Sequence, residues 1–115
     1  MMRRSLLFLP GNQPNMLQNG AVLPADALIF DLEDSVSPSE KDAARELVAS
    51  ALRSIDYGSR GLVVRINDID KPYVKKDLEA VAAAGAMSVM VPKVSGAHTI
   101  HHVAVMLDLI EEEYR

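Results

Sequence analysis

The chain has 115 residues and contains no cysteine, so disulfide bonds and thiolate metal sites are excluded. It also has few basic residues, because 12 lysines and arginines stand against 16 aspartates and glutamates and the net charge is -4. Nucleic-acid-binding proteins normally carry a basic patch. We therefore expect no nucleic-acid partner.

Long hydrophobic runs are absent as well. The N-terminal segment MMRRSLLFLPGNQ places two arginines before an apolar stretch, but that stretch extends only from Leu6 to Leu9 before Pro10 and Gly11 end it. A signal peptide needs about 7–15 apolar residues, and a membrane-spanning helix needs about 20. We expect a soluble, cytoplasmic protein without a membrane partner.

The sequence does contain a repeated alternation of short apolar runs and amphipathic segments. Residues 5–9, 27–32, 61–67 and 87–94 are apolar runs that predict four buried strands. Helix-start signals follow the first two runs: Asn12 as a cap before Pro14, then Ser37 as a cap with Glu40 completing a capping box. Asp70 opens a third predicted helix, and a fourth follows residues 95–96.

This βα pattern, repeated four times, indicates a parallel sheet with helices packed outside it. Two architectures fit the pattern, an open doubly wound sheet or part of a (β/α)8 barrel. A complete barrel takes about 250 residues, so four units make up about half of one. Periodicity alone does not choose between these architectures.

Polar residues gather where the predicted strands end, which is where parallel α/β folds bind ligands. They are Pro10, Gly11 and Asn12 after the first strand, Asp31, Glu33 and Asp34 after the second, Arg65, Asn67 and Asp68 around the end of the third, and Lys93 after the fourth. We expect these residues to share one edge of the sheet.

Arg65 is the most informative of these residues. Strand alternation places Val63 and Arg65 on one face and Val64 on the other. A guanidinium in so apolar a strand needs a partner, and we expect Glu33 or Asp34 to supply it. Arg65 can also bind a ligand carboxylate with two hydrogen bonds. The alternative is a plain ion pair that joins two strands.

Other interpretations of the polar residues fit less well. The segment FDLED is similar to the acidic motif of haloacid-dehalogenase-type phosphatases but lacks the Gly-Thr that follows it there. The acids together with Lys93 are similar to a phosphoacceptor receiver domain, but that site also needs a separate aspartate ending the third strand, which here ends Asn67-Asp68. His98 and His102 are four residues apart on a predicted helix, and we interpret them as surface residues.

Four segments together resemble one family. RRSLLFLPGN, ADALIFDLEDSVSPSEKDAAR, VVRIN and VMVPKV resemble, in order and spacing, the citrate lyase branch of the HpcH/HpaI aldolase superfamily, to which the citrate lyase beta subunit belongs. The resemblance implies a (β/α)8 barrel, of which residues 1–115 would form the N-terminal half. It also implies a carbon–carbon lyase that cleaves a citryl thioester into oxaloacetate and an acetyl thioester.

The family resemblance also assigns roles to individual residues. Arg65 matches an arginine that binds the keto-acid carboxylate and is the expected catalytic residue. Glu33 and Asp34 match acids that pair with this arginine, and Pro10 and Gly11 match the loop that lines the thioester side. The implied partners are the keto acid, coenzyme A or an acyl-carrier protein, and either a second copy of the chain or the citrate lyase alpha and gamma subunits.

The resemblance implies Mg²⁺ as the cofactor, which polarises the keto acid. Its glutamate and aspartate ligands in the family follow the fifth and sixth strands, beyond residue 115, so no metal ligand is assigned in this chain. Glu111, Glu112 and Glu113 end a predicted helix and are not these ligands. The alternative to an active lyase is a catalytically silent fragment or a half-barrel that serves as an assembly partner.

Overall fold

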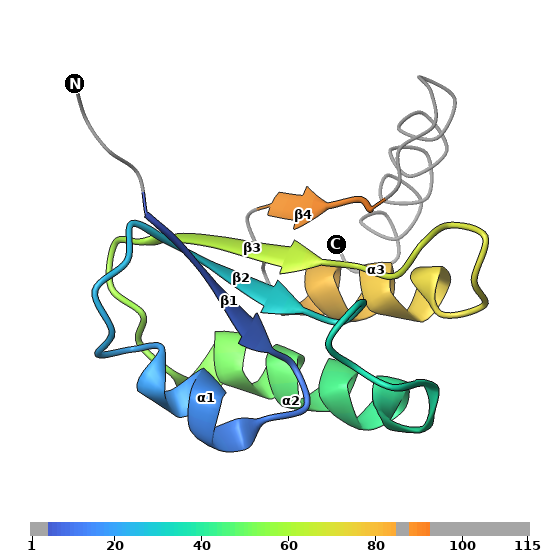
Figure 1. Ribbon diagram of the computed structural model, residues 1–115, viewed down its shortest axis with the longest axis horizontal. Helices are drawn as coiled ribbons and strands as arrows, with labels where there is room; N and C mark the ends of the chain where they lie inside the picture. The colour runs from blue at the N-terminus through green and yellow to red at the C-terminus, as the bar shows by residue number, and fades with distance from the viewer. Residues whose placement is uncertain (1–4, 85–87, 93–115) are drawn as a thin grey trace.

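The computed structural model describes residues 5–84 and 88–92 (Figure 1). Its elements in chain order are β1 (Leu6–Pro10), α1 (Pro14–Asn19), β2 (Ala27–Asp31), the 3-10 turn η1 (Pro38–Glu40), α2 (Lys41–Ser54), β3 (Gly61–Arg65), α3 (Val74–Ala83) and β4 (Ser88–Met90). The four predicted strands are therefore confirmed. The last predicted helix, Lys93, the histidines and residues 111–113 lie outside the described residues.

The four strands form one parallel sheet in the order β1-β2-β3-β4. A doubly wound sheet changes direction at its switch point, whereas the strands of a (β/α)8 barrel follow one another in chain order. The observed order is therefore that of a barrel. In this register Pro10 is opposite Asp31, Asp31 is opposite Arg65, and Arg65 is opposite Met90, so the strand ends lie in one row.

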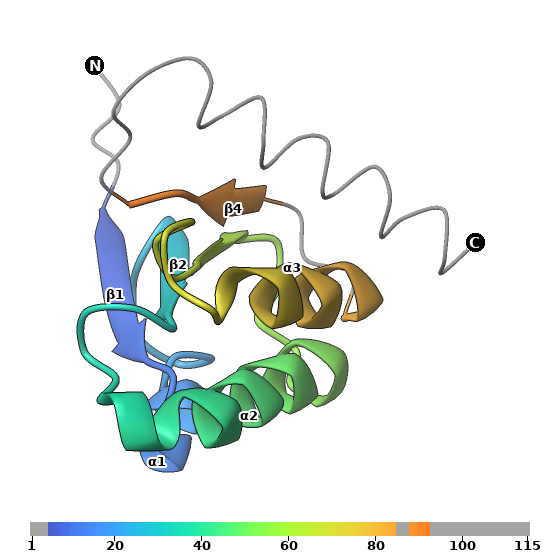
Figure 2. The same ribbon diagram turned by 90° about the vertical axis from the view of Figure 1, so that its right-hand side faces the viewer.

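The described helices α1, α2 and α3 cover the same face of the sheet (Figures 1 and 2). The core between the two layers contains Leu9, Leu28, Phe30, Val64 and Ile66 from the sheet and its continuation, and Leu17, Ala44, Val48, Leu78 and Val81 from the helices. Val64 and Ile66 are fully buried, as the alternation predicts. Arg65 therefore projects toward the face opposite the one that α1, α2 and α3 cover.

The predicted helix caps agree only in part with the structure. Gln13, not Asn12, precedes α1, and the side-chain amide of Asn12 instead donates to the Glu40 carboxylate. Ser37 is an N-cap residue as predicted, but of the 3-10 turn η1 rather than of α2, which begins at Lys41. The Ser37 side chain makes no cap hydrogen bond, so no capping box forms. The sequence therefore located the start of α2 to within a few residues. The capping box is absent because the Glu40 carboxylate that it requires accepts a hydrogen bond from Asn12 instead. Asp70 does not open the third helix, because Tyr73 precedes α3. No helix in residues 5–84 or 88–92 is long and apolar enough to cross a membrane.

Candidate functional site

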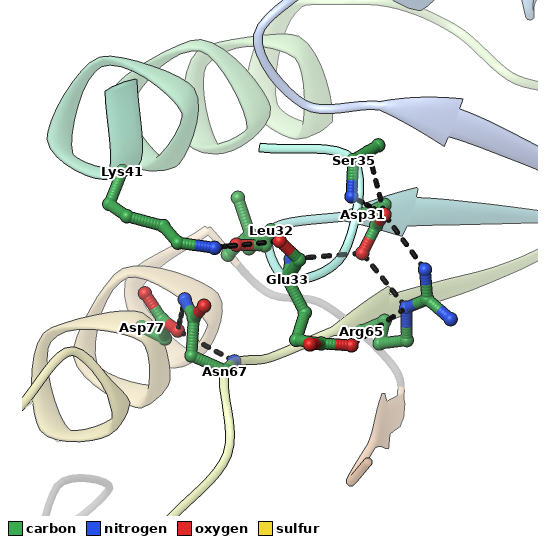
Figure 3. Close-up of polar contacts among 8 residues, drawn as sticks. All are labelled: Asp31, Leu32, Glu33, Ser35, Lys41, Arg65, Asn67 and Asp77. Carbon is green, nitrogen blue, oxygen red and sulfur yellow. Dashed lines mark hydrogen bonds and ion pairs between the residues drawn. The ribbon is translucent and has the colours of Figure 1, made fainter. Parts of the chain in front are cut away.

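The site is centred on an ion pair between the last residues of two neighbouring strands, Asp31 of β2 and Arg65 of β3 (Figure 3). Nε of Arg65 donates to Oδ1 of Asp31 and Nη2 donates to Oδ2, both at 2.8 Å. This geometry is the two-bond, side-on arrangement that guanidinium and carboxylate groups favour. Asp31 is 2% exposed, whereas the Arg65 side chain is 22% exposed.

Asp31 also organises the turn that follows β2. Its carboxylate accepts hydrogen bonds from the backbone N–H of Glu33 and Ser35, both at 2.9 Å, and from the Ser35 hydroxyl at 2.6 Å. Burial would raise the pKa of Asp31, but the hydrogen bonds from Arg65, Ser35 and Glu33 together hold that pKa well below its usual range. Asp31 therefore stays ionised and fixed in place.

The prediction that Glu33 or Asp34 would pair with Arg65 was only partly correct. Glu33 Oε1 lies 3.9 Å from Nε of Arg65, which is a weaker contact than the one with Asp31. Asp34 forms no ion pair with Arg65 among the residues that the structure describes. Asp31 is the principal partner because the parallel register places it directly opposite Arg65. The sequence could have indicated this, since both residues end their strands.

A cavity of about 340 Å³ opens beside the ion pair. Its lining consists of Phe8, Pro10, Asp31, Asp34, Ser35 and Arg65. The Phe8 ring lies 4.9 Å from Cζ of Arg65, close enough for a cation–π interaction. Asp31 thus holds Arg65 from β2 and Phe8 holds it from β1, with the guanidinium at the cavity wall.

Gly11 is buried and is not among the residues that line the cavity. Its N–H donates to the Asp31 carbonyl oxygen at 2.8 Å. A Cβ atom on Gly11 would lie only 2.6 Å from that same oxygen, so a side chain would push β1 and β2 apart here. The structure thus gives Gly11 a close-packing role, while Pro10 and Asp34 reach the cavity.

Asn67 was expected at the ligand-binding edge but is turned away from the cavity. Its backbone N–H and its side-chain amide both donate to Oδ2 of Asp77, at 3.0 and 2.6 Å. The other oxygen of Asp77, which is only 1% exposed, accepts from Nε of Arg45 at 2.9 Å. Asp77 therefore fastens the chain after β3 to helices α2 and α3.

Lys41 is a further residue that the sequence interpretation missed. Its Nζ donates to the carbonyl oxygens of Leu32 at 3.0 Å and Glu33 at 2.6 Å, and the residue is 8% exposed. A lysine so deeply buried is unusual. The signal was present in the sequence, because Lys41 lies three residues before Ala44 and seven before Val48, on the same apolar face of α2.

Among the described residues, the charges at the cavity are mostly negative. Asp31, Glu33 and Asp34 surround one guanidinium, that of Arg65. Both oxygens of Asp31 already accept N–H or O–H donors, which leaves Asp31 poorly suited to bind a metal. No group of three metal-ligating side chains occurs within residues 5–84 and 88–92. The described residues therefore do not complete a Mg²⁺ site.

Comparison with known sequences gives one consistent result. The family model described as HpcH/HpaI aldolase/citrate lyase matches residues 4–115. The citrate lyase subunit beta of Leuconostoc mesenteroides subsp. cremoris is 44% identical over 98% of this chain and 37% of its own length. A (3S)-malyl-CoA thioesterase of Cereibacter sphaeroides (strain ATCC 17029) is 43% identical over 90% of this chain and 36% of its own length. The chain spans little more than a third of these curated relatives.

Solved structures agree with the sequence matches. The citrate lyase beta subunit from M. tuberculosis, complexed with oxaloacetate and magnesium, superposes with a TM-score of 0.72 at 36% identity, over 86% of this chain and 42% of that one. The CitE protein from Mycobacterium tuberculosis in complex with magnesium, acetoacetate and coenzyme A gives 0.72 at 33% identity, over 88% and 36%. The predicted α/β fold of the (β/α)8-barrel type is confirmed.

Proposed function

Because this chain belongs to the HpcH/HpaI aldolase/citrate lyase family, we propose that residues 1–115 are the N-terminal half of a (β/α)8-barrel lyase. The reaction is cleavage of a citryl thioester, carried by coenzyme A or an acyl-carrier protein, into oxaloacetate and an acetyl thioester. The relatives matched over nearly the whole chain include citrate lyase beta subunits, which supports this choice.

One observation carries the proposal, namely the way in which Arg65 is held. Its hydrogen bonds to Asp31 use the Nε–Nη2 edge of the guanidinium, and the side chain lines the cavity. An arginine has a second edge, Nη1–Nη2, that can bind a second carboxylate with two hydrogen bonds. We assign this edge to the carboxylate of the keto acid.

Holding the keto acid in this way would serve catalysis by orientation. Fixing one end of the substrate places the bond to be broken at a constant position relative to the protein, which lowers the entropic part of the barrier. Asp31 and Phe8 keep the guanidinium from turning, so little of its freedom is lost on binding. Asp34 and Pro10, which line the cavity, are proposed to border the keto acid and the thioester respectively. Glu33 and Gly11 are proposed to support these contacts from outside the lining, Glu33 beside Arg65 and Gly11 through the close packing of β1 against β2.

Charge balance supports a requirement for a divalent cation. A dianionic keto acid entering beside Asp31, Glu33 and Asp34 would be repelled, because Arg65 offsets only part of their charge. Mg²⁺ when bound would polarise the keto-acid oxygens and stabilise negative charge that develops on them. We propose that its ligands lie in sequence beyond residue 115. The proposed macromolecular partners are a second copy of the protein or the citrate lyase alpha and gamma subunits.

The second candidate function is hydrolysis of malyl-CoA. It is favoured by one observation, the 43% identity to (3S)-malyl-CoA thioesterase, which nearly equals the 44% identity to citrate lyase beta. The proposed role of Arg65 is compatible with either substrate, since both carry a carboxylate that Arg65 could bind. Incubation with citryl-CoA and with malyl-CoA, followed by analysis of the products, separates the two candidates.

Isothermal titration of the protein that carries this chain with oxaloacetate tests the proposal. We expect heat of binding with Mg²⁺ and little without it. Arg65→Ala should weaken binding at least about a hundredfold, because charged hydrogen bonds are lost. Arg60→Ala is the matched control, since Arg60 precedes β3 at its opposite end. Unchanged affinity in Arg65→Ala would refute the role of Arg65, and no binding to the intact protein would indicate a catalytically silent chain.

A further inference from the structure

We propose that Lys41 is a positioning residue, which fixes the turn of residues 31–35 so that its carboxylates hold Arg65 in a ligand-binding orientation (Figure 3). This inference deepens the proposed function, because it rests on Arg65 as the residue that binds the ligand. Lys41 itself does not line the cavity, so its effect must pass through the backbone of the turn.

The first step is the attachment of the turn to helix α2. Nζ of Lys41 reaches from the first residue of α2 to two successive carbonyl oxygens, those of Leu32 and Glu33. Both acceptors are neutral peptide groups, so these bonds set the direction of the backbone rather than neutralise a carboxylate. The ammonium group also lies 5.8 Å from the centre of the Tyr73 ring at the start of α3, which gives it a second point of contact.

The second step is the connection of the same two residues, Leu32 and Glu33, to the ion pair. The N–H of Leu32 donates to the Arg65 carbonyl oxygen at 2.9 Å. The N–H of Glu33 donates to Oδ1 of Asp31, and this same oxygen accepts from Nε of Arg65. Leu32 and Glu33 are thus each bonded to Lys41 through the carbonyl oxygen and to the Asp31–Arg65 pair through the N–H. Release of the carbonyl oxygens would loosen both connections together.

The third step is the cost of keeping a lysine there. Burial lowers the pKa of Lys41, and the nearby carboxylates of Glu33 and Asp77 raise it again in part. A buried ammonium group is expensive unless its hydrogen bonds are made. An apolar side chain would fill this space at lower cost if packing were its only purpose. Two hydrogen bonds to one turn indicate that the geometry of the turn is what the lysine secures.

The test compares Lys41→Met with wild type in the protein that carries this chain. Methionine keeps the unbranched apolar stem and removes every N–H donor. Lys75→Met is the matched control, because Lys75 is an exposed lysine on α3. Lys41→Arg restores a cationic donor and is the rescue variant. Lys41→Leu, which also has no N–H donor, replaces Lys41→Met if that protein does not fold.

Two readouts separate this inference from the proposed function. The first needs no ligand: the Nε–H resonance of Arg65, assigned by its loss in Arg65→Lys, is followed by ¹⁵N NMR for exchange with water. We expect exchange about tenfold faster in Lys41→Met, as for the loss of one hydrogen bond, and no change in Lys75→Met. The second is oxaloacetate affinity with Mg²⁺, which we expect to weaken about tenfold in Lys41→Met and to recover at least in part in Lys41→Arg.

The outcomes are distinct. Unchanged exchange at Arg65 in a folded Lys41→Met or Lys41→Leu protein would overturn the inference, whatever the ligand affinity. Faster exchange without a change in oxaloacetate affinity would support the link from Lys41 to Arg65 but would contradict the proposed role of Arg65. Equal effects in Lys75→Met and Lys41→Met would show a general response to loss of positive charge and would also overturn the inference.

Discussion

Two arginines stand at opposite ends of β3, and their hydrogen-bond partners differ. Arg60, just before the strand, donates to three backbone carbonyl oxygens, those of Tyr57, Leu23 and Ala21, at 3.0, 2.6 and 2.7 Å. Arg65, the last residue of the strand, donates to one carboxylate and lines a cavity. Neutral acceptors around the whole guanidinium make a structural tie. Among the described residues, Arg65 donates to a carboxylate from one edge of its guanidinium, and we propose that its other edge binds a ligand.

The difference extends to the two ends of the sheet. At the amino end, Arg60 joins two loops through uncharged acceptors, so the tie does not depend on the ionisation of a partner. At the carboxyl end, buried carboxylates hold the chain: Asp31 binds Arg65 and Asp77 binds Arg45. We therefore expect the carboxyl end to respond strongly to loss of charge and to acid, and the amino end to respond only to loss of hydrogen bonds.

The largest effect is expected from Asp77→Asn, which removes the negative charge beside Arg45. The Arg45 side chain is 9% exposed and would remain charged and poorly compensated. Breaking a buried ion pair in this way costs about 3–5 kcal/mol of unfolding free energy. Urea unfolding of the protein that carries this chain measures it. Asp42→Asn is the control, because Asp42 contacts the same arginine but is 82% exposed and should change stability little. Equal effects would contradict the importance of burial.

The second prediction compares Arg65→Met with Arg60→Met at two pH values. Each change should cost about 2–3 kcal/mol near pH 7, since several hydrogen bonds are lost. The pKa of Asp31 is held below its ordinary value of 3.8 in the folded protein. The stability that its ion pair provides is therefore fully present above pH 3.8 and is lost progressively as the pH falls toward the folded-state pKa. The cost of Arg65→Met should therefore shrink at pH 2.5, while the cost of Arg60→Met should not.

Urea midpoints at pH 7 and pH 2.5 give both values for each variant. Wild type measured at the same pH is the reference, which cancels the general effect of acid on the protein. A cost of Arg65→Met that is independent of pH would contradict the assignment of Asp31 as its ionised partner. A cost of Arg60→Met that falls in acid would mean that an unrecognised carboxylate supports the amino end.

The sequence predicted the fold better than it predicted the site. Four apolar runs separated by amphipathic segments are a local pattern, and local pattern is sufficient to locate strands and helices. Arg65 stood out because a charge in an apolar strand is rare. Its partner was missed because the partner depends on which residues lie opposite each other, and register is set by the pairing of whole strands rather than by spacing within one.

The buried charges on the helices were missed for a related reason. Lys41, Arg45 and Asp77 lie among many charged residues of amphipathic helices, where most charges face solvent. Only the positions of β2 and β3 relative to α2 and α3 show that these three face inward. The capping-box prediction was wrong because its glutamate is bonded by Asn12, 28 positions earlier in the chain. The spacing of residues at the start of a helix cannot predict a contact with a residue so distant in the chain.

Gly11→Ala tests the closeness of β1 and β2 at the site. A methyl group there would meet the Asp31 carbonyl oxygen at 2.6 Å, and backbone cannot move aside as readily as a flexible side chain. We expect a loss of about 1–2 kcal/mol. The control is Gly61→Ala near the amino end, where the added atom would make an ordinary 3.4 Å contact with Ala27. A greater loss in Gly61→Ala would reverse the proposed difference in packing between the two ends.

The smallest effect is expected from Tyr57→Phe at the amino end. The Tyr57 hydroxyl donates to the Leu17 carbonyl oxygen at 2.7 Å, and its ring packs edge-on against Phe30 at 5.2 Å. Phenylalanine keeps the ring contact and removes one neutral hydrogen bond, so the cost should be about 1 kcal/mol and the same at pH 7 and pH 2.5. Tyr73→Phe is the control, because the Tyr73 hydroxyl forms no hydrogen bond to a described residue. A cost of Tyr57→Phe above that of Arg65→Met would place the main support of the sheet at its amino end.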